Sequence, residues 1–149
     1  MITLLQRVSH ARVDVRGVSI GSIDAGLLVF VAVERDDCEQ VVLSVLKRII
    51  DYRVFPDHAG KMNLSLLDVH GGMLLVPQFT LAADTRSGTR PSFTPAASPE
   101  KGRRLFEYLV TQARERYRHV ATGQFAADMQ VALTNDGPVT FILRSSGKG

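Results

Sequence analysis

An uninterrupted apolar run, residues 27–33, constrains the fold of this chain more than any other feature of its sequence. A strand formed from this run is hydrophobic on both faces and therefore needs cover on both. The run is far too short to span a bilayer as a helix. It predicts a central, buried strand with further strands beside it and other elements packed on its faces.

Other segments supply the neighbouring strands, because their apolar residues are alternating or continuous. Residues 11–15 alternate with period two up to Gly17, which predicts a half-buried strand followed by a hairpin. The first third of the chain is therefore mostly sheet. The hairpin partner and the remaining predicted strands cover residues 18–23, 53–55, 73–76, 129–133 and 139–143.

Two segments have the periodicity of helices that pack on such a sheet. Asp36 or Asp37 is predicted to cap the first, whose apolar residues recur at four-residue spacing. Ser98 and Pro99 are favourable first residues for the second, which is predicted to run to about His119. The predicted inward faces are Val41, Val42, Val45, Leu46, Ile49 and Ile50 in the first helix, and Leu105, Phe106, Leu109, Val110 and Ala113 in the second.

The fold class predicted from these elements is α/β (α+β), a sheet-rich chain with two main helices packed on the sheet. The 149 residues fit a single domain, residues 1–149, of which residues 145–149 are predicted to be a flexible tail. A composition of 45% hydrophobic and 22% charged residues indicates a globular protein. Residues 82–99 are predicted to form one long loop, and such loops in compact domains are usually functional or disordered.

The sequence lacks the patterns of metal, cofactor and membrane chemistry. Its one cysteine, Cys38, has acidic neighbours and no disulfide partner, which makes it a poor nucleophile and favours a reducing, cytoplasmic setting. No export signal follows Met1, no metal-ligand spacing joins the four histidines, and no glycine-rich phosphate loop occurs. We therefore expect no metal, no other cofactor and no membrane partner. The net charge of +3 weakly favours a polyanionic partner.

Two segments place polar backbone at strand ends, where binding sites commonly lie. Residues 77–81 leave one predicted strand, and residues 135–140 join the last two. In isolation the second segment would be a turn, Gln78 and Thr80 polar ends of a strand, and Phe79 a core residue.

Together with other stretches, these segments resemble the D-aminoacyl-tRNA deacylase (D-tyrosyl-tRNA deacylase) family. That family carries a Ser-Gln-Phe-Thr motif, matched here by Gln78, Phe79 and Thr80, and an Asn-X-Gly-Pro-X-Thr motif, matched over residues 135–140. The resemblance implies a barrel-like mixed sheet and a homodimer. It extends from Met1 to about Arg144, and its other matching stretches are residues 5–8, 60–63, 89–93 and 123–130.

The resemblance implies hydrolysis of the ester bond in D-aminoacyl-tRNA, with the 3′-adenosine end of that tRNA as the partner. Gln78, Phe79 and Thr80 would form the catalytic segment, whose backbone amides hold the ester while the ribose 2′-hydroxyl helps activate water. Thr80 is read as a positioning residue, because no histidine lies nearby in the sequence to make it a nucleophile. The adenosine would be bound by Leu81, Phe125 and Met129, of which the last two would otherwise be plain packing residues.

The resemblance assigns chiral selection to Gly137 and Pro138, as a cis peptide that reaches into the active site of the other subunit. Arg7, otherwise an ordinary surface arginine, would brace this motif. Main-chain groups would reject an L side chain without reading its identity. Achiral glycine would then also be accepted, including glycyl-tRNA misacylated on tRNA-Ala.

One residue departs from the family pattern: Pro77 stands where the family has serine, so both the hydroxyl and the N–H are absent. If catalysis needed that serine, this chain would be impaired. We favour a site that works through the backbone after Pro77. The alternative function is a non-catalytic tRNA- or nucleotide-binding module with the same fold, and a synthetase-attached editing domain is disfavoured because no synthetase body is present. The basic helix residues Arg114, Arg116 and Arg118 are interpreted as a solvated face rather than a tRNA contact, because Glu107 and Glu115 dilute their charge.

Overall fold

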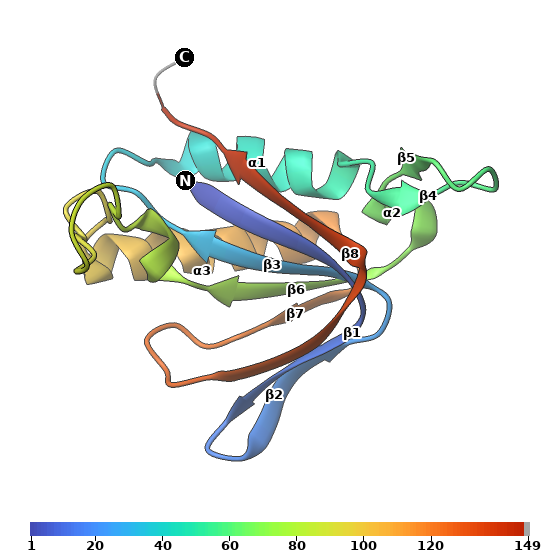
Figure 1. Cartoon of the computed structure of the whole chain (residues 1–149), viewed down its shortest axis with the longest axis horizontal. Coiled ribbons are helices and arrows are strands. Elements are labelled where there is room, and N and C mark those ends of the chain that lie inside the picture. The colour runs from blue at the N-terminus through green and yellow to red at the C-terminus, as the bar shows by residue number, and fades with distance from the viewer. Residues whose placement is uncertain (148–149) are drawn as a thin grey trace.

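The computed structural model describes residues 1–147, and its centre is a six-stranded mixed sheet (Figure 1). β1 is antiparallel to β2, β3 and β8, whereas the β3–β6 and β6–β7 pairs are parallel. The predicted apolar run forms β3, which lies between β1 and β6 and is buried on both faces. The strands of the sheet are β1 (Ile2–Val15), β2 (Val18–Ile23), β3 (Gly26–Ala32), β6 (Gly72–Pro77), β7 (Val120–Thr122) and β8 (Gln130–Arg144).

The curvature of the sheet comes from β1, whose two halves pair with different neighbours. Residues 2–8 pair with β3 and residues 11–15 with β2, while β8 follows the opposite edge of β1. The far end of β2 then comes back onto β7. Gly21 lies so close to Thr122 that an added Cβ would be 2.5 Å from the Thr122 carbonyl oxygen. The sheet is therefore a nearly closed barrel, which agrees with the resemblance.

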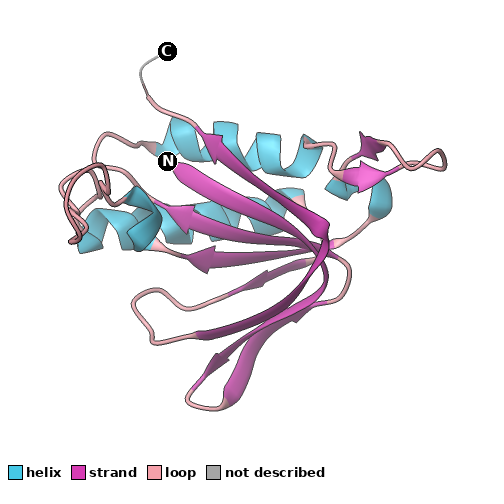
Figure 2. Cartoon of the chain, viewed as in Figure 1, coloured by secondary structure: helices cyan, strands magenta, loops and turns pink. Residues whose placement is uncertain are grey.

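Two helices, α1 (Glu39–Asp51) and α3 (Pro99–Arg116), cover one face of the sheet (Figures 1 and 2). The predicted apolar stripe of α1 is buried throughout, and that of α3 is buried except for half-buried Val110. A second apolar cluster, which includes Val8 and Leu74, fills the inside of the curled sheet. The short elements are α2 (Leu66–Val69), β4 (Phe55–Pro56), β5 (Met62–Leu64) and the 3-10 turn η1 (Phe79–Ala82).

The predicted cap of α1 is wrong. Neither Asp36 nor Asp37 caps the helix, because Cys38 occupies the N-cap position and makes no side-chain cap bond. Asp37 is buried instead, and its carboxylate accepts hydrogen bonds from the Met1 ammonium at 2.5 Å and from the Glu34 amide at 2.7 Å. A buried carboxylate needs such partners, and this requirement outweighs the helix cap.

The predicted end of α3 is three residues too late, since the helix ends at Arg116 rather than His119. Tyr117 follows in an extended conformation and is buried, with 7% of its surface exposed. The single hydrogen of its hydroxyl is shared between the carbonyl oxygens of Leu66, 3.1 Å away, and Gly71, 2.5 Å away. Continuing the helix would withdraw this hydroxyl from two buried acceptors.

The predicted strand boundaries also shift in two places. Residues 135–138 do not separate two strands but lie within the continuous strand β8, where the pairing with β1 slips beside Val8. Pro138 has no amide hydrogen to give to a ladder, which explains an irregularity at this point. The short strand predicted at residues 53–55 begins only at Phe55.

The predicted loop over residues 82–99 is confirmed apart from its two ends, because Ala82 belongs to η1 and Pro99 begins α3. The structure describes residues 145–147 of the predicted tail, and the first of them is bonded to the chain start. The Met1 ammonium donates to the Ser145 carbonyl at 2.6 Å, and the Ser145 amide donates back to Met1 at 3.0 Å. Residues 148–149 lie outside the described residues. The helices of the described part are all too short or too polar to cross a membrane.

Candidate active site

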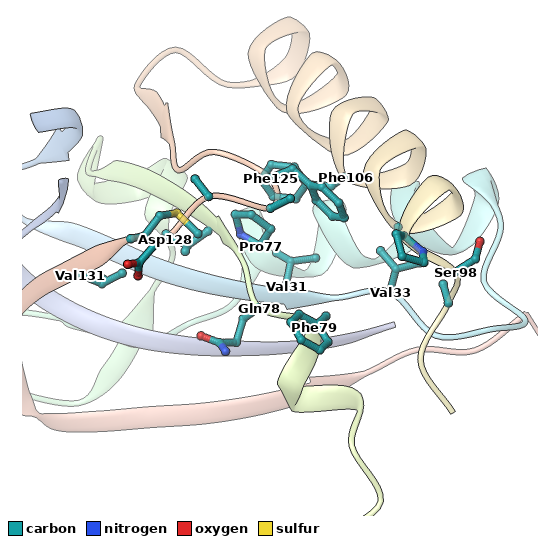
Figure 3. Close-up of a pocket in the computed structure, with 17 residues that line it drawn as sticks. Val31, Val33, Pro77, Gln78, Phe79, Ser98, Phe106, Phe125, Asp128 and Val131 are labelled. Atoms are coloured by element: carbon teal, nitrogen blue, oxygen red, sulfur yellow. The ribbon is translucent and has the colours of Figure 1, made fainter. Parts of the chain in front are cut away.

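A largely apolar cavity of about 460 Å³ opens at the end of β6, between the sheet, the start of α3 and the segment that precedes β8 (Figure 3). Phe106 and Phe125 stand on its α3 side, and Val31 and Pro77 on its sheet side (Figure 3). Cavities of this volume hold small molecules up to the size of a nucleotide. The cavity is therefore the candidate site of this molecule.

The rim of the cavity forms where the chain leaves β6. The Gln78 amide makes the last bond of the strand, to β3 at 2.8 Å, and η1 begins at the next residue. The first bond that returns within η1 runs from the Leu81 amide to the Gln78 carbonyl at 3.2 Å. The amides of Phe79 and Thr80 therefore have no acceptor inside the turn. The rim offers two backbone donors beside an apolar cavity.

Phe125 forms one wall of the cavity and is fixed from α3. Gly102 makes room for its ring, because an added Cβ at that position would lie 3.3 Å from Phe125 Cζ. The Phe106 ring packs beside it with a centroid separation of 6.4 Å. The guanidinium carbon of Arg103 lies over the Phe125 ring, 4.9 Å from the centroid. Gly102 and Phe106 thus hold the Phe125 ring as one flat, apolar wall, and Arg103 lies over it.

Four of the predicted site residues line the cavity, and two neighbours on η1 do not. The Thr80 hydroxyl lies beside the cavity and accepts a hydrogen bond from the Gln78 side chain. Leu81 packs away from the cavity, against a buried cluster that contains Ile2 and Ala82. The four residues in the lining are Gln78, Phe79, Phe125 and Met129.

Most of the other lining residues were not predicted as part of a site, and three of them bring a helix end or a charge to the cavity. Ser98 and Pro99, predicted only as a helix start, bring the N-terminus of α3 to the cavity. Asp128 is the one ionisable side chain among the lining residues of the described chain, and Figure 3 places its carboxylate beside Val131. Their local patterns, a helix start and a family-like stretch, do not show that they meet at one cavity, because tertiary folding brings them together. Gly123 is the local sequence feature that comes closest to indicating the cavity, because its missing side chain leaves space for the Met129 sulfur.

The second predicted motif lies in the middle of β8, and its Gly137–Pro138 peptide bond is cis, as the resemblance implies. The Asn135 side chain donates to the carbonyls of Arg7 and Val139, both at 2.9 Å. Arg7 Nε donates to the Asp136 carbonyl at 3.1 Å, and Arg7 Nη1 donates at 2.7 Å to a carbonyl just before β4. Arg7 therefore lies against this motif, and two side chains hold its backbone.

The two motifs lie at different levels of the sheet within one chain. Pro77 is level with Val31 of β3 and with Thr3 of β1, whereas the second motif is level with Gln6 and Val8 of β1. Three to five strand residues correspond to roughly 10–17 Å along the strands. β3 and β1 also lie between β6 and β8. The second motif of a chain is therefore remote from the cavity of the same chain.

A charged pair stabilises the loop beside the rim. Arg86 donates two side-chain hydrogen bonds to the Asp84 carboxylate, at 2.9 and 2.8 Å. These bonds, followed by one from the Arg86 amide, lower the pKa of Asp84 to about 2. The backbone of Asp84 pairs with Ser92, and the next residue, Phe93, packs on Phe79 with ring centroids 5.2 Å apart.

The basic residues in the last turn of α3 lie away from the cavity. Arg114 and Arg116 are at the far end of α3 from the cavity, and the Arg116 side chain donates to Gln112 at 3.1 Å. Within residues 1–147, no three or more His, Cys, Asp or Glu side chains come together where they could hold a metal ion.

These features define a class of protein: a curled mixed sheet with two helices on one face, and a nucleoside-sized cavity rimmed by free backbone donors at the end of a strand. The family described as D-Tyr-tRNA(Tyr) deacylase matches residues 4–144. The chain belongs to this family.

Individual relatives agree with this assignment. The chain is 63% identical over 144 residues to the D-aminoacyl-tRNA deacylase of Janthinobacterium sp. (strain Marseille), covering 97% of each. It is 62% identical over 145 residues to the D-aminoacyl-tRNA deacylase of Pseudomonas aeruginosa (strain UCBPP-PA14), covering 97% of this chain and 100% of the relative.

Two solved structures have the same fold. The c-Myc DNA Unwinding Element Binding Protein superimposes with a TM-score of 0.94 at 34% identity, covering 99% of this chain and all of the other. A probable eukaryotic D-amino acid tRNA deacylase superimposes with a TM-score of 0.83 at 15% identity, covering 95% and 97% of the two chains, which shows likeness of fold alone.

Proposed function

We propose that this chain hydrolyses the ester bond of D-aminoacyl-tRNA and releases the free D-amino acid and tRNA. The observation that carries the proposal is the 62–63% identity, along nearly the whole chain, to proteins named D-aminoacyl-tRNA deacylase. The proposal includes glycyl-tRNA misacylated on tRNA-Ala, because glycine has no side chain for a chiral filter to exclude. We place the reaction in the cytoplasm, where an unpaired thiol such as Cys38 stays reduced.

In this proposal the 3′-terminal adenosine occupies the cavity, with its base between Phe125 and Met129. Both residues line the cavity, and their apolar groups suit the flat faces of a base. The ribose and the ester then lie at the rim, next to η1. Leu81 takes no part, because its side chain packs on another cluster.

At the rim, the free amides of Phe79 and Thr80 bind the ester carbonyl oxygen and the negative charge that develops on it. Water adds to the carbonyl carbon, the bond to the ribose oxygen breaks, and that oxygen leaves as a hydroxyl with a proton from the water. An aminoacyl ester is already activated, so a held carbonyl and a water positioned with help from the ribose 2′-hydroxyl are sufficient. Thr80 is a positioning residue, because its hydroxyl is engaged by Gln78 and not by a base.

Chiral selection comes, in this proposal, from Gly137 and Pro138 of a second copy of the chain in a homodimer. The distance between the two motifs within one chain supports this arrangement, because a chain cannot insert its own motif into its own cavity. β8 pairs only with β1 among the described strands, and its residues Phe141 and Ile142 are 36% and 56% exposed. Such an apolar edge strand is a suitable surface for a second copy. Arg7 is then a positioning residue that holds the motif.

The test is to follow ester loss from matched D- and L-tyrosyl-tRNA over time. We expect rapid loss of the D ester alone. Equal loss of both esters would contradict chiral selection, and loss of neither would contradict hydrolysis. Pro77→Ser is expected to change the rate by less than about threefold, because the η1 amides are unchanged, whereas a catalytic hydroxyl would change it roughly 100-fold.

The second candidate function is a non-catalytic tRNA- or nucleotide-binding module. Two observations favour it: Pro77 replaces the family serine, and a structure 34% identical to this chain is named for binding a DNA element. Binding of D-tyrosyl-tRNA without ester loss in the same assay would support this candidate over hydrolysis.

The homodimer has a separate test. Ile142→Glu places a charge on the β8 edge and is expected to yield a monomer by light scattering, with D and L esters no longer distinguished. Val18→Glu is the control, because Val18 is 63% exposed on the β1–β2 hairpin, away from that edge. A monomer that still rejects the L ester would exclude the cross-subunit arrangement.

A further inference from the structure

Arg103 places a free cationic group against the wall of the cavity. Its guanidinium carbon lies 4.9 Å from the centroid of Phe125, which lines the cavity. The acidic oxygen paired with it, Glu107 Oε1, is 3.8 Å away, which exceeds hydrogen-bond distance. The Arg103 side chain is 52% exposed. Its N–H groups are therefore available to an anion that approaches this side of the cavity.

The next residue provides a contrast within the same helix turn. Arg104 is 58% exposed, similar to Arg103, but it donates a hydrogen bond to Glu39 of α1 at 3.4 Å. Successive helix residues project about 100° apart, so the two arginines serve different faces of α3. The two arginines have similar exposure and the same charge, but only Arg103 contacts the cavity wall.

We propose that Arg103 binds the phosphate that links the terminal adenosine to the preceding nucleotide. This inference rests on the proposed function, which puts the base on Phe125, the ester at η1 and a second chain on the η1 side. The rest of the tRNA strand then leaves along the α3 side. A guanidinium can stack on an aromatic ring and bind phosphate oxygens with two N–H groups at once.

The electrostatic setting of α3 is consistent with a phosphate there. The N-terminal end of α3 lies at the cavity through Ser98 and Pro99, and the positive end of its dipole has the same sign as Arg103. Glu100 in the first turn and Glu107 about two turns further along oppose this charge in part. The phosphate site therefore depends on the Arg103 side chain rather than on a strong general field.

The test compares substrates with and without the phosphate. For Arg103→Gln, we expect the KM for D-tyrosyl-tRNA to rise roughly three- to tenfold at unchanged kcat. A plot of log affinity for the tRNA against log salt concentration should also become less steep, by about the slope that one phosphate contact contributes. Hydrolysis of D-tyrosyl-adenosine, which lacks the phosphate, should not change. Arg104→Gln should leave both substrates unaffected, and Arg103→Lys should recover most of the binding of the tRNA.

A binding measurement makes the result independent of turnover. Calorimetry should show that the unmodified protein prefers adenosine 5′-monophosphate to adenosine, and that Arg103→Gln removes this preference. Equal weakening of both ligands would mean that Arg103 only orients Phe125, and an unchanged preference would mean that the phosphate lies elsewhere. Either outcome overturns the inference. If the unmodified protein does not hydrolyse the ester, but Arg103→Gln removes the preference for adenosine 5′-monophosphate, only the proposed function is overturned.

Discussion

The sheet is interrupted at the end of β6 and in the middle of β8, and the two interruptions treat their polar groups in different ways. After β6, the amides of Phe79 and Thr80 have no acceptor in η1, and the Phe79 ring is 60% exposed. At β8, the side chains of Asn135 and of Arg7 from β1 hold the backbone on both sides of Gly137. The end of β6 keeps backbone amides free for a ligand, whereas the backbone in the middle of β8 is fixed by side chains.

This difference suits the two parts proposed for these regions. A site that binds a reacting ester needs unoccupied donors, because only free donors can bind the charge that develops there. A surface that excludes one enantiomer needs a fixed position, because a mobile wall would yield to the wrong side chain. If this comparison is right, substitutions in the β8 motif reduce stability and selectivity together, whereas substitutions at the cavity act mainly on binding.

The largest effect is expected for Gly137→Ala. Gly137 has a φ of +137°, and an added Cβ would lie 2.6 Å from Val139 Cγ2 and 3.2 Å from Arg7 Nη2. Strain and overpacking together should lower the free energy of unfolding by about 2–4 kcal/mol. Urea unfolding followed by circular dichroism measures this loss.

Gly17→Ala is the matched control for Gly137→Ala. Gly17 also has a positive φ, +76°, but no atom lies within 4 Å of its added Cβ. The Gly17→Ala substitution should lower the free energy of unfolding by only about 1 kcal/mol, from backbone strain alone. Equal losses at the two glycines would mean that the β8 motif is not tightly packed, and the comparison between the regions would then fail.

Arg7→Ala is expected to have the next largest effect. The Arg7 side chain is 12% exposed and donates to two carbonyls, so its removal should lower the free energy of unfolding by about 2–3 kcal/mol. Discrimination between D- and L-tyrosyl-tRNA should fall at least about tenfold if the motif shifts by even a fraction of an ångström.

Arg12→Ala tests whether any arginine of β1 would behave in this way. Arg12 is 55% exposed and pairs with Asp14. Its replacement by alanine should therefore lower the free energy of unfolding by less than about 1 kcal/mol, and selectivity between the D and L esters should not change. If Arg7→Ala is destabilised but remains as selective as the unmodified protein, Arg7 stabilises the fold without positioning the motif.

The sequence predicted the sheet and both helices because their apolar patterns are local. The run that became β3 and the stripe of α1 needed no knowledge of distant residues. The errors arose where a long-range contact decides the outcome. Asp37 leaves the helix cap for the Met1 ammonium, and Tyr117 ends α3 because of two carbonyls some 50 residues away in the chain.

The candidate site was predicted only where a motif carries it. Gln78, Phe79, Phe125 and Met129 belong to stretches that resemble the family, and they meet at one cavity. Arg103 belongs to no motif, and its contact with Phe125 depends on how α3 packs. A helix pattern alone specifies which face is apolar but not which polar residue lies beside a distant ring.

A smaller effect, on binding alone, is expected for Gly123→Ala. The added Cβ would lie 2.8 Å from the Met129 sulfur, so the flexible Met129 side chain must move, and the cavity is beside it. The KM for D-tyrosyl-tRNA should rise roughly fivefold, with a stability loss below about 1.5 kcal/mol. Gly60→Ala, with no atom near its added Cβ, should leave KM unchanged. A kcat effect without a KM effect would mean that Met129 does not contact the base.

The smallest effect concerns acid and again separates the two regions. The pKa of Asp84 is lowered from 3.8 to about 2 by its bonds to Arg86. A lowered pKa in the folded state means that the pair stabilises the loop above pH 3.8, and that this contribution is lost as the pH falls from 3.8 towards 2. Because Asp84 is bonded to Ser92 next to Phe93, the Phe79–Phe93 contact at the rim should loosen over the same range.

Carbon-detected NMR can follow this change directly. The Asp84 carboxyl should titrate near pH 2, with the ring signals of Phe79 moving alongside, and Arg86→Gln should shift both midpoints up towards 3.8. The signals of Asn135 and Gly137 should not follow that midpoint, because no bond joins the Asp84–Arg86 pair to the β8 motif. If the β8 signals moved together with Asp84, the two interruptions of the sheet would be coupled, and the open rim could not be treated as mechanically separate from the fixed motif.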